Sequence, residues 1–96
     1  MPFAPLDPVL HNQLRLAVVS LLVSVERADF NFLLEKTGAT RGNLSVQISK
    51  LKEAGYIQVT KGMRDNYPNT MCRLTPEGVR AFEAYVKAIK GYLGRP

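Results

Sequence analysis

Residues 29–55, DFNFLLEKTGATRGNLSVQISKLKEAG, contain two helix-like segments separated by a glycine turn. Asp29 is a favourable N-cap for the first segment, and Gly38 is the residue type that commonly follows a helix C-terminus. Thr40 and Gly55 bracket the second segment in the same way. A short helix, a tight turn and a second helix form a helix-turn-helix arrangement, whose second helix enters the major groove in DNA-binding proteins.

The second segment has one apolar face and one small, polar face. Leu44, Ile48 and Leu51 recur at intervals of four and three residues, which predicts a buried stripe. The opposite face carries Gly42 and Val46, and a helical glycine exposed only to water costs roughly 1 kcal/mol relative to alanine. These residues favour close approach to DNA over the alternative of an ordinary polar outer face. The candidate DNA-binding residues of this helix are Thr40, Arg41, Gly42, Asn43, Ser45, Val46, Ser49 and Lys50.

A β-hairpin is predicted after the helix-turn-helix. Residues 56–61 and 70–74 have the pattern of two strands, and residues 62–69 are rich in loop-forming types. Lys61 and Arg64 are candidate phosphate or minor-groove contacts, with Asn66 as a weaker donor. Asp65 reduces the local positive charge, so a connecting turn with incidental charge is the alternative for this segment.

Longer helices are predicted on either side, at residues 10–24 and 75–93. The centre of the first, LAVVSLLV, is apolar on nearly every side, and the second carries two adjacent apolar rows. Both could cover the domain's own core only, but exposed rows of this extent favour an isologous homodimer interface. Its candidate residues are Leu14, Val18, Leu21, Phe82, Tyr85, Val86, Ile89, Tyr92 and Leu93.

The chain, residues 1–96, is predicted to be a single domain of mainly α (α+β) class. Three helices, a two-stranded β wing over residues 56–74 and a long C-terminal helix make a winged helix-turn-helix. The net charge of +5 is uneven, because residues 1–40 have three basic and four acidic residues, whereas residues 41–73 have six basic and two acidic ones. A localised basic segment predicts a polyanion partner such as double-stranded DNA.

Other classes of function have little support in the sequence. One histidine, His11, and scattered acids provide no catalytic triad and no metal-ligand spacing, so we expect neither an enzyme nor a metal or cofactor site. His11 is expected to open the first helix as a surface or capping residue, and Cys72 to be a small packed residue rather than a redox sensor. No apolar run approaches the ~18 residues of a membrane span, and MPFAPLDP (1–8) lacks the basic and apolar regions of a secretory signal, so we expect a cytoplasmic protein.

Three stretches resemble the winged-helix transcriptional regulators related to the MarR and ArsR groups. They are LDPVLHNQLRLAVVSLL (6–22), DFNFLLEKTGATRGNLSVQISKLKEAGYIQV (29–59) and RLTPEGVRAFEAYV (73–86). The resemblance implies a homodimer that binds a pseudo-palindromic operator, usually as a repressor, with base-reading positions between residues 40 and 50. The hairpin sequence GMRDNYPNTMC departs from the pattern, because it has fewer basic residues than relatives usually have.

Two other functions remain open at this point. A winged helix can serve as a protein–protein interaction module in a larger assembly, which predicts little salt-dependent affinity for DNA. An effector-gated sensor, with an unknown small-molecule effector, requires a ligand-sized apolar cavity between the first and last helices.

Overall fold

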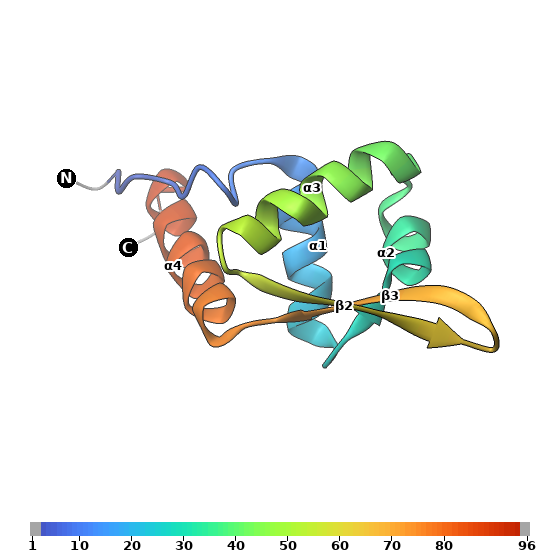
Figure 1. Ribbon diagram of the computed structural model, residues 1–96. Helices are drawn as coiled ribbons and strands as arrows, with labels where there is room; N and C mark the ends of the chain where they lie inside the picture. The colour runs from blue at the N-terminus through green and yellow to red at the C-terminus, as the bar shows by residue number, and fades with distance from the viewer. Residues whose placement is uncertain (1–2, 95–96) are drawn as a thin grey trace.

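Four helices and a small antiparallel sheet make up the computed structural model, which describes residues 3–94 (Figure 1). The order is α1 (Gln13–Ser24), β1 (Ala28–Asp29), α2 (Phe30–Thr37), α3 (Arg41–Glu53), β2 (Ile57–Arg64), β3 (Tyr67–Leu74) and α4 (Pro76–Tyr92). The α+β winged helix predicted from the sequence is therefore confirmed. Within residues 3–94, no helix is long and apolar enough to cross a membrane.

The helix-turn-helix forms where its capping residues predict. The Asp29 carboxylate accepts a hydrogen bond from the Phe32 amide at 2.8 Å, and Gly38 ends α2 in the left-handed region with φ 68°. The Thr40 hydroxyl accepts from the Asn43 amide at 3.1 Å and so begins α3. These side chains satisfy amides that have no partner inside their helix, which fixes both helix starts locally.

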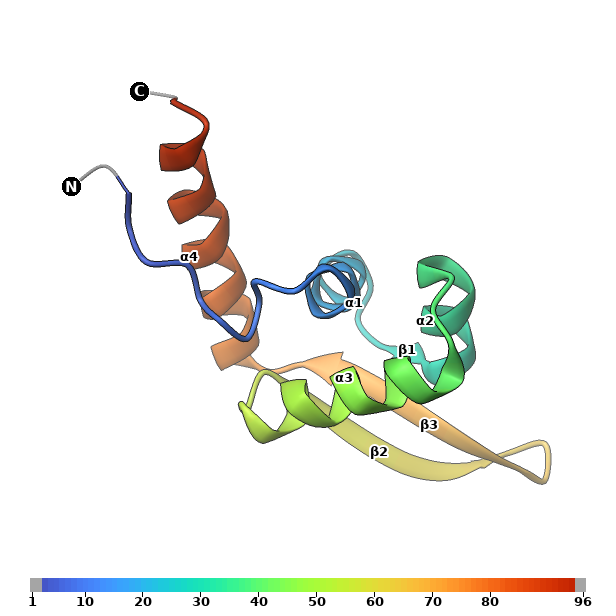
Figure 2. The same ribbon diagram turned by 90° about the horizontal axis from the view of Figure 1, so that it is seen from above.

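Helix α1 begins three residues later than the sequence predicts, because Asn12 is its N-cap. The Asn12 side chain accepts from the Arg15 amide at 2.9 Å. His11 therefore precedes the helix and does not open it, while Leu10 is fully buried ahead of the first turn. Seen along its axis in Figure 2, α1 lies in the middle of the domain. Its apolar surface packs against α2, α3, α4 and β3. Because apolar residues are needed on several sides of α1, its sequence has no single apolar face.

The sheet differs from the prediction in two ways. It has three strands in the order β1-β3-β2, because the two-residue β1 pairs Ala28 with Cys72 and Asp29 with Met71. The hairpin loop was also predicted too long. Strands β2 and β3 stay paired as far as Arg64 and Tyr67, and only Asp65 and Asn66 form the turn, with φ 52° and 66°. Two consecutive residues of positive φ are the requirement of the tight hairpin turn whose twist matches that of the strands.

The first turn of α4 makes an unusually close contact with the body. A Cβ atom on Gly78 would lie 2.1 Å from the Tyr56 carbonyl oxygen, so only glycine permits this approach. The same carbonyl accepts from the Thr75 amide at 3.0 Å, and the Thr75 side chain accepts from the Gly78 amide at the same distance. From this joint α4 projects away from α3 (Figure 2), and the domain measures 53 × 25 × 21 Å.

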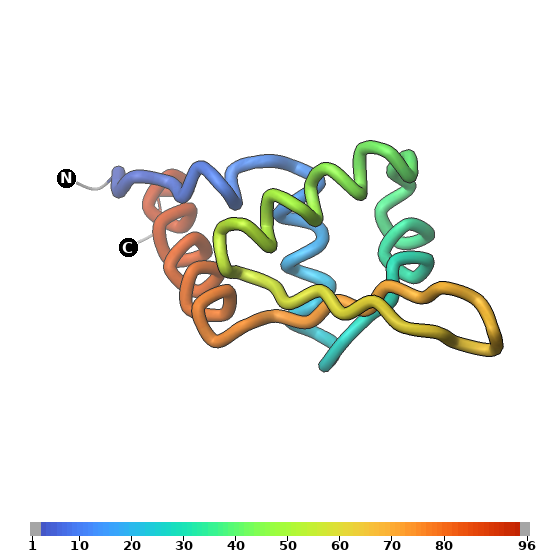
Figure 3. Tube along the Cα trace, in the orientation of Figure 1, coloured from blue at the N-terminus to red at the C-terminus, as the bar shows by residue number. Residues whose placement is uncertain are grey.

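The residues before α1 fold back along α4, as the trace in Figure 3 shows. The Tyr56 hydroxyl donates to the Asp7 carboxylate at 2.5 Å, and the Tyr92 hydroxyl donates to the Ala4 carbonyl at 2.8 Å. The rings of Phe3 and Tyr92 also stand 5.2 Å apart. The prolines of this segment account for its extended course. The segment covers part of the α4 surface that is predicted to form a dimer interface.

Candidate nucleic-acid interface

Helix α3 has the two faces that the sequence predicts. Leu44, Ile48 and Leu51 are buried in the core, and the most exposed of them, Ile48, is only 6% exposed. Val46, on the opposite side, is 51% exposed. The other exposed residues of the candidate set on and before this helix are Thr40, Arg41, Gly42, Asn43, Ser45, Ser49 and Lys50. Gly42 faces open space, since a Cβ atom built there meets nothing within 4 Å.

A groove of about 330 Å³ separates α3 from the hairpin. Arg41 and Lys52 line its helical side, and Lys61 lines its β2 side. The lining contains no acidic side chain; the remaining residues are Phe30, Ser45, Ile48, Ser49, Val59 and Thr70. The three cations therefore give the groove a positive charge of the kind that attracts phosphates.

Lys52 and Thr70 are groove residues that the sequence analysis missed. Lys52 follows Ser45 and Ser49 at helical spacing, so the periodicity of α3 could have identified it. Thr70 pairs with Lys61 across the hairpin, and that register depends on the tight turn that was not predicted. Cross-strand partners share a face of the sheet, which brings Thr70 into the groove beside Lys61.

Arg41 is held in place by neutral partners. Its guanidinium donates to the Asn31 side-chain oxygen at 3.2 Å and stands 5.7 Å from the centre of the Phe30 ring. Neither partner carries a negative charge. The side chain is thus oriented while its positive charge remains available to an anion.

A chain of polar side chains supports the first turn of α3. Arg15 of α1 donates to the Gln47 side-chain oxygen, and the Gln47 amide nitrogen donates to the Asn43 oxygen at 3.0 Å. Arg15 also donates to the backbone carbonyls of Val9 and Pro8. The recognition face of α3 is therefore tied both to α1 and to the segment that precedes it.

The hairpin offers fewer free cations than its sequence suggests. Lys61 faces the groove, but Arg64 forms an ion pair with the Asp29 carboxylate at 3.1 Å. Asn66 is one of the two turn residues and is exposed. Met63 and Tyr67 near the tip are 68% and 74% exposed.

The residues assigned to a dimer interface fall into two groups. Val18 is fully buried and Tyr85 is 7% exposed, so both belong to the monomer's own core. Val18 is covered because α1 is central to the domain, and Tyr85 is covered where His11 Nδ1 lies 3.0 Å from its hydroxyl, so these two offer little surface to a second copy. The remaining residues keep some exposure: Leu14, Leu21, Phe82 and Ile89 pack partly on the core, Val86 is half-buried, and Tyr92 and Leu93 are exposed.

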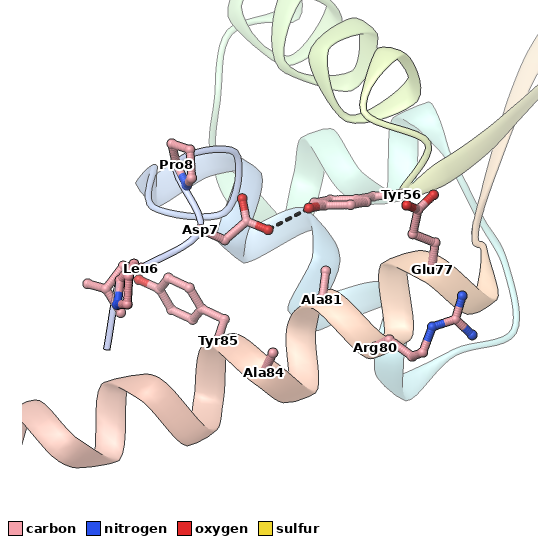
Figure 4. A pocket seen from close by; sticks show the side chains of 10 residues that line it. Leu6, Asp7, Pro8, Tyr56, Glu77, Arg80, Ala81, Ala84 and Tyr85 are labelled. Carbon is pink, nitrogen blue, oxygen red and sulfur yellow. Dashed lines mark hydrogen bonds between the residues drawn. The ribbon is translucent and has the colours of Figure 1, made fainter. Parts of the chain in front are cut away.

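A cavity of about 480 Å³ lies between the N-terminal segment and α4 (Figure 4). Asp7, Tyr56, Glu77 and Arg80 give it polar groups, and the rest of its lining is mostly apolar. No residue of α1 lines it, so it is not the cavity between the first and last helices that an effector-gated sensor would need. The hydrogen bond to Asp7 raises the pKa of Tyr56 to about 12, and burial and the charges of Asp7 and Glu77 act in the same direction.

No metal site is formed by residues 3–94, which contain no group of three or more histidine, cysteine or acidic side chains close enough to hold an ion. Cys72 is fully buried on β3, as expected for a packed residue. Burial, together with the nearby charge of Asp29, raises the pKa of the Cys72 thiol to about 11. The reactive thiolate form is therefore disfavoured.

Comparison with known proteins gives the same classification as the geometry. Residues 14–93 match the family model of the winged helix DNA-binding domain, and the chain belongs to this family. An uncharacterised protein from Methanocaldococcus jannaschii is 31% identical over 81 residues, which cover 84% of this chain and 88% of that protein.

Solved structures share the fold at lower identity. A transcriptional regulator homologue from Pyrococcus horikoshii superposes with a TM-score of 0.83 at 24% identity, covering 90% of this chain and 85% of that one. A protein from Halomicrobium mukohataei with a GntR superfamily winged-helix-turn-helix domain gives a TM-score of 0.72 at 19% identity, covering 91% and 66%. The family and the exposed α3 together describe a winged helix DNA-binding domain.

Proposed function

We propose that this chain is a homodimeric, MarR-like transcriptional regulator, acting as a repressor, that reads a pseudo-palindromic operator with α3. The observation that carries the proposal is the exposed polar face of α3 beside a groove lined by Arg41, Lys52 and Lys61. Side chains on such a helix can reach base edges in the major groove, while cations at its border hold the phosphates.

The free surface of α4 supports a homodimer. Val79, Tyr92 and Leu93 are 41%, 44% and 68% exposed, and Val86 lies half-buried on the same helix. Helix α4 projects away from α3 (Figure 2), so a second copy packed there leaves the candidate DNA-binding faces uncovered. A two-fold dimer would place its α3 helices about 34 Å apart, one turn of DNA, on the two half-sites.

A salt titration of DNA binding tests the class of function. Binding of the full chain to a mixed-sequence duplex is followed by fluorescence anisotropy, and sedimentation measures the oligomeric state of the chain alone and on DNA. We expect affinity to fall steeply as salt rises, because the protein's cations release counterions from the phosphates. We also expect two copies to bind together on the duplex. Weak binding without salt dependence would instead favour a protein–protein interaction module.

A further inference from the structure

The side-chain amides of Gln47 and Asn43 have only one orientation that satisfies their neighbours. An arginine guanidinium carries donors and no acceptor, so Arg15 can bond only to the oxygen of Gln47. The Gln47 nitrogen then faces Asn43 and donates to its oxygen at 3.0 Å. The orientation of an amide is set by its hydrogen-bond network, and here the arginine sets two amides in succession.

The starting point of this network is itself fixed. Arg15 is in the first turn of α1, and its guanidinium also donates to the carbonyls of Val9 and Pro8. Both carbonyls can only accept hydrogen bonds and the guanidinium can only donate them, so the direction of these bonds cannot be reversed. Gln47 is partly buried between α1 and the exposed face of α3, which limits its access to other partners.

Asn43 is the exposed end of the network. It is the third residue of α3, and it follows Gly42, where a Cβ atom would meet nothing within 4 Å. Residues at the N-terminal end of a recognition helix are the ones that reach base edges. Since the Asn43 oxygen is turned back toward Gln47, its amide nitrogen is the group left facing outward, with two N–H donors.

We propose that Arg15 and Gln47 are positioning residues that fix Asn43 as a hydrogen-bond donor toward DNA, so that this turn of α3 selects against cytosine. Guanine presents the acceptors O6 and N7 in the major groove, and thymine presents O4. Cytosine presents an amino donor there, which the Asn43 amino group cannot accept. Adenine stays compatible through its N7 acceptor, but the paired contact of asparagine with adenine needs both amide atoms facing the base, and the network turns one of them away.

The test is a reversal of base preference by Gln47→Glu. The substituted carboxylate keeps Arg15 as its partner but can only accept hydrogen bonds, so Asn43 must turn its nitrogen toward that carboxylate and its oxygen toward DNA. In random-site selection with the unaltered chain, one position of each half-site is expected to favour guanine or thymine over cytosine by about tenfold, within the range of a good base contact. Gln47→Glu is expected to shift that position toward cytosine, whose amino group can donate to the outward oxygen of Asn43.

Three companion variants separate the network from general effects of charge and folding. Asn43→Ala should remove the preference at that position, and adding Gln47→Glu to it should change nothing more, because the switch acts through Asn43. Gln47→Met should weaken the preference without reversing it, since Asn43 is then free to turn. Thermal unfolding of each variant confirms that the fold is retained.

Because the inference rests on the proposed reading of DNA by α3, the outcomes that overturn each are different. A Gln47→Glu variant that binds all four base variants more weakly by one common factor would overturn the inference alone and reassign Asn43 to a phosphate. A selected position that keeps its preference in Asn43→Ala would also overturn it. An unaltered chain with no salt-dependent affinity for any duplex would overturn the proposed function together with the inference.

Discussion

Helix α3 and the β2–β3 hairpin line the same groove, but they leave different groups free for a partner. On α3, Arg41 is oriented by neutral side chains, and Asn43 is oriented by a chain of hydrogen bonds that begins at Arg15. On the hairpin, Arg64 is paired with Asp29, and Lys61 is the cation that faces the groove. Under the proposed function, we expect α3 to supply selectivity and most of the attraction, and the hairpin a smaller and adjustable share.

The largest effect is expected from Arg41→Ala. Removing this guanidinium should weaken binding to the selected operator by about 1–3 kcal/mol if it contacts a base. Its hydrogen bond to Asn31 is exposed and Phe30 keeps its own packing on the core, so the fold should be retained. Anisotropy titrations with operator and with mixed-sequence DNA measure the change. An equal loss on both would place Arg41 on a phosphate.

Two glycine substitutions compare the helix and the hairpin directly. Gly42→Ala should stabilise the domain by roughly 1 kcal/mol, because alanine is the better helix former and the site is open. It should nevertheless weaken operator binding by more than the roughly 0.5 kcal/mol typical of surface changes, since the added methyl group lies between α3 and the groove of DNA. Gly62→Ala, which also faces open space on the hairpin, is the matched control.

Thermal unfolding and anisotropy give the two readings for each glycine variant. A Gly42→Ala variant that is more stable but binds the operator more weakly, with binding unchanged in Gly62→Ala, would support close approach of α3, and not of the hairpin, to DNA. Equal losses of affinity in both variants would contradict the proposed difference between α3 and the hairpin.

A smaller effect is expected from Asp29→Asn, which releases Arg64. Asparagine is as good an N-cap as aspartate, so α2 should keep its first turn. The freed arginine should raise affinity for DNA by less than about 1 kcal/mol and steepen the salt dependence by about one phosphate contact. Asp65→Asn changes the net charge equally without releasing Arg64. If both variants change the salt slope by the same amount, the ion pair has no role in binding.

The N-terminal segment is expected to affect stability and leave DNA binding unchanged. Tyr56→Phe removes the hydrogen bond to Asp7, at a cost of about 0.5–1.5 kcal/mol in the free energy of unfolding. The folded-state pKa of Tyr56 is raised from 10.0 to about 12, so its contribution is complete below pH 10 and is lost as the pH rises toward 12. Cys72 also ionises in alkali in both proteins, and its contribution cancels in the comparison.

Denaturant unfolding at pH 8 and pH 11 measures this difference. Tyr56→Phe should be the less stable protein at pH 8, and the gap between the two proteins should narrow at pH 11. A constant gap would show that the hydroxyl does not contribute through its neutral, hydrogen-bonding form.

The features that follow from short-range rules were predictable from the sequence. The caps at Asp29 and Thr40, the end of α2 at Gly38 and the buried row of α3 depend on residues within a few positions of one another. The hairpin loop was predicted too long because Gly62 and Pro68 are usually loop residues. Beyond β1 the hairpin is a two-stranded ribbon, where a proline need not donate to a neighbouring strand.

Features that depend on distant residues were not predictable. The pairing of Arg15 with Gln47 spans 32 positions, and nothing in either local pattern predicts it. Val18 and Tyr85 have the spacing of interface residues, but the folded-back N-terminal segment and the central position of α1 bury them within one chain. The sequence presents Arg64 as a free cation, and only the fold brings it to Asp29.

Random-site selection with the full chain, followed by binding to the selected duplex, tests most directly the claim that α3 reads DNA as a pair. We expect an enriched pseudo-palindrome with half-sites about 10 base pairs apart, centre to centre. We also expect Asn43→Ala to lose the preference at one position of each half-site. A selected pool with no enriched sequence, or an enriched sequence that Asn43→Ala and Arg41→Ala both leave unchanged, would contradict the account.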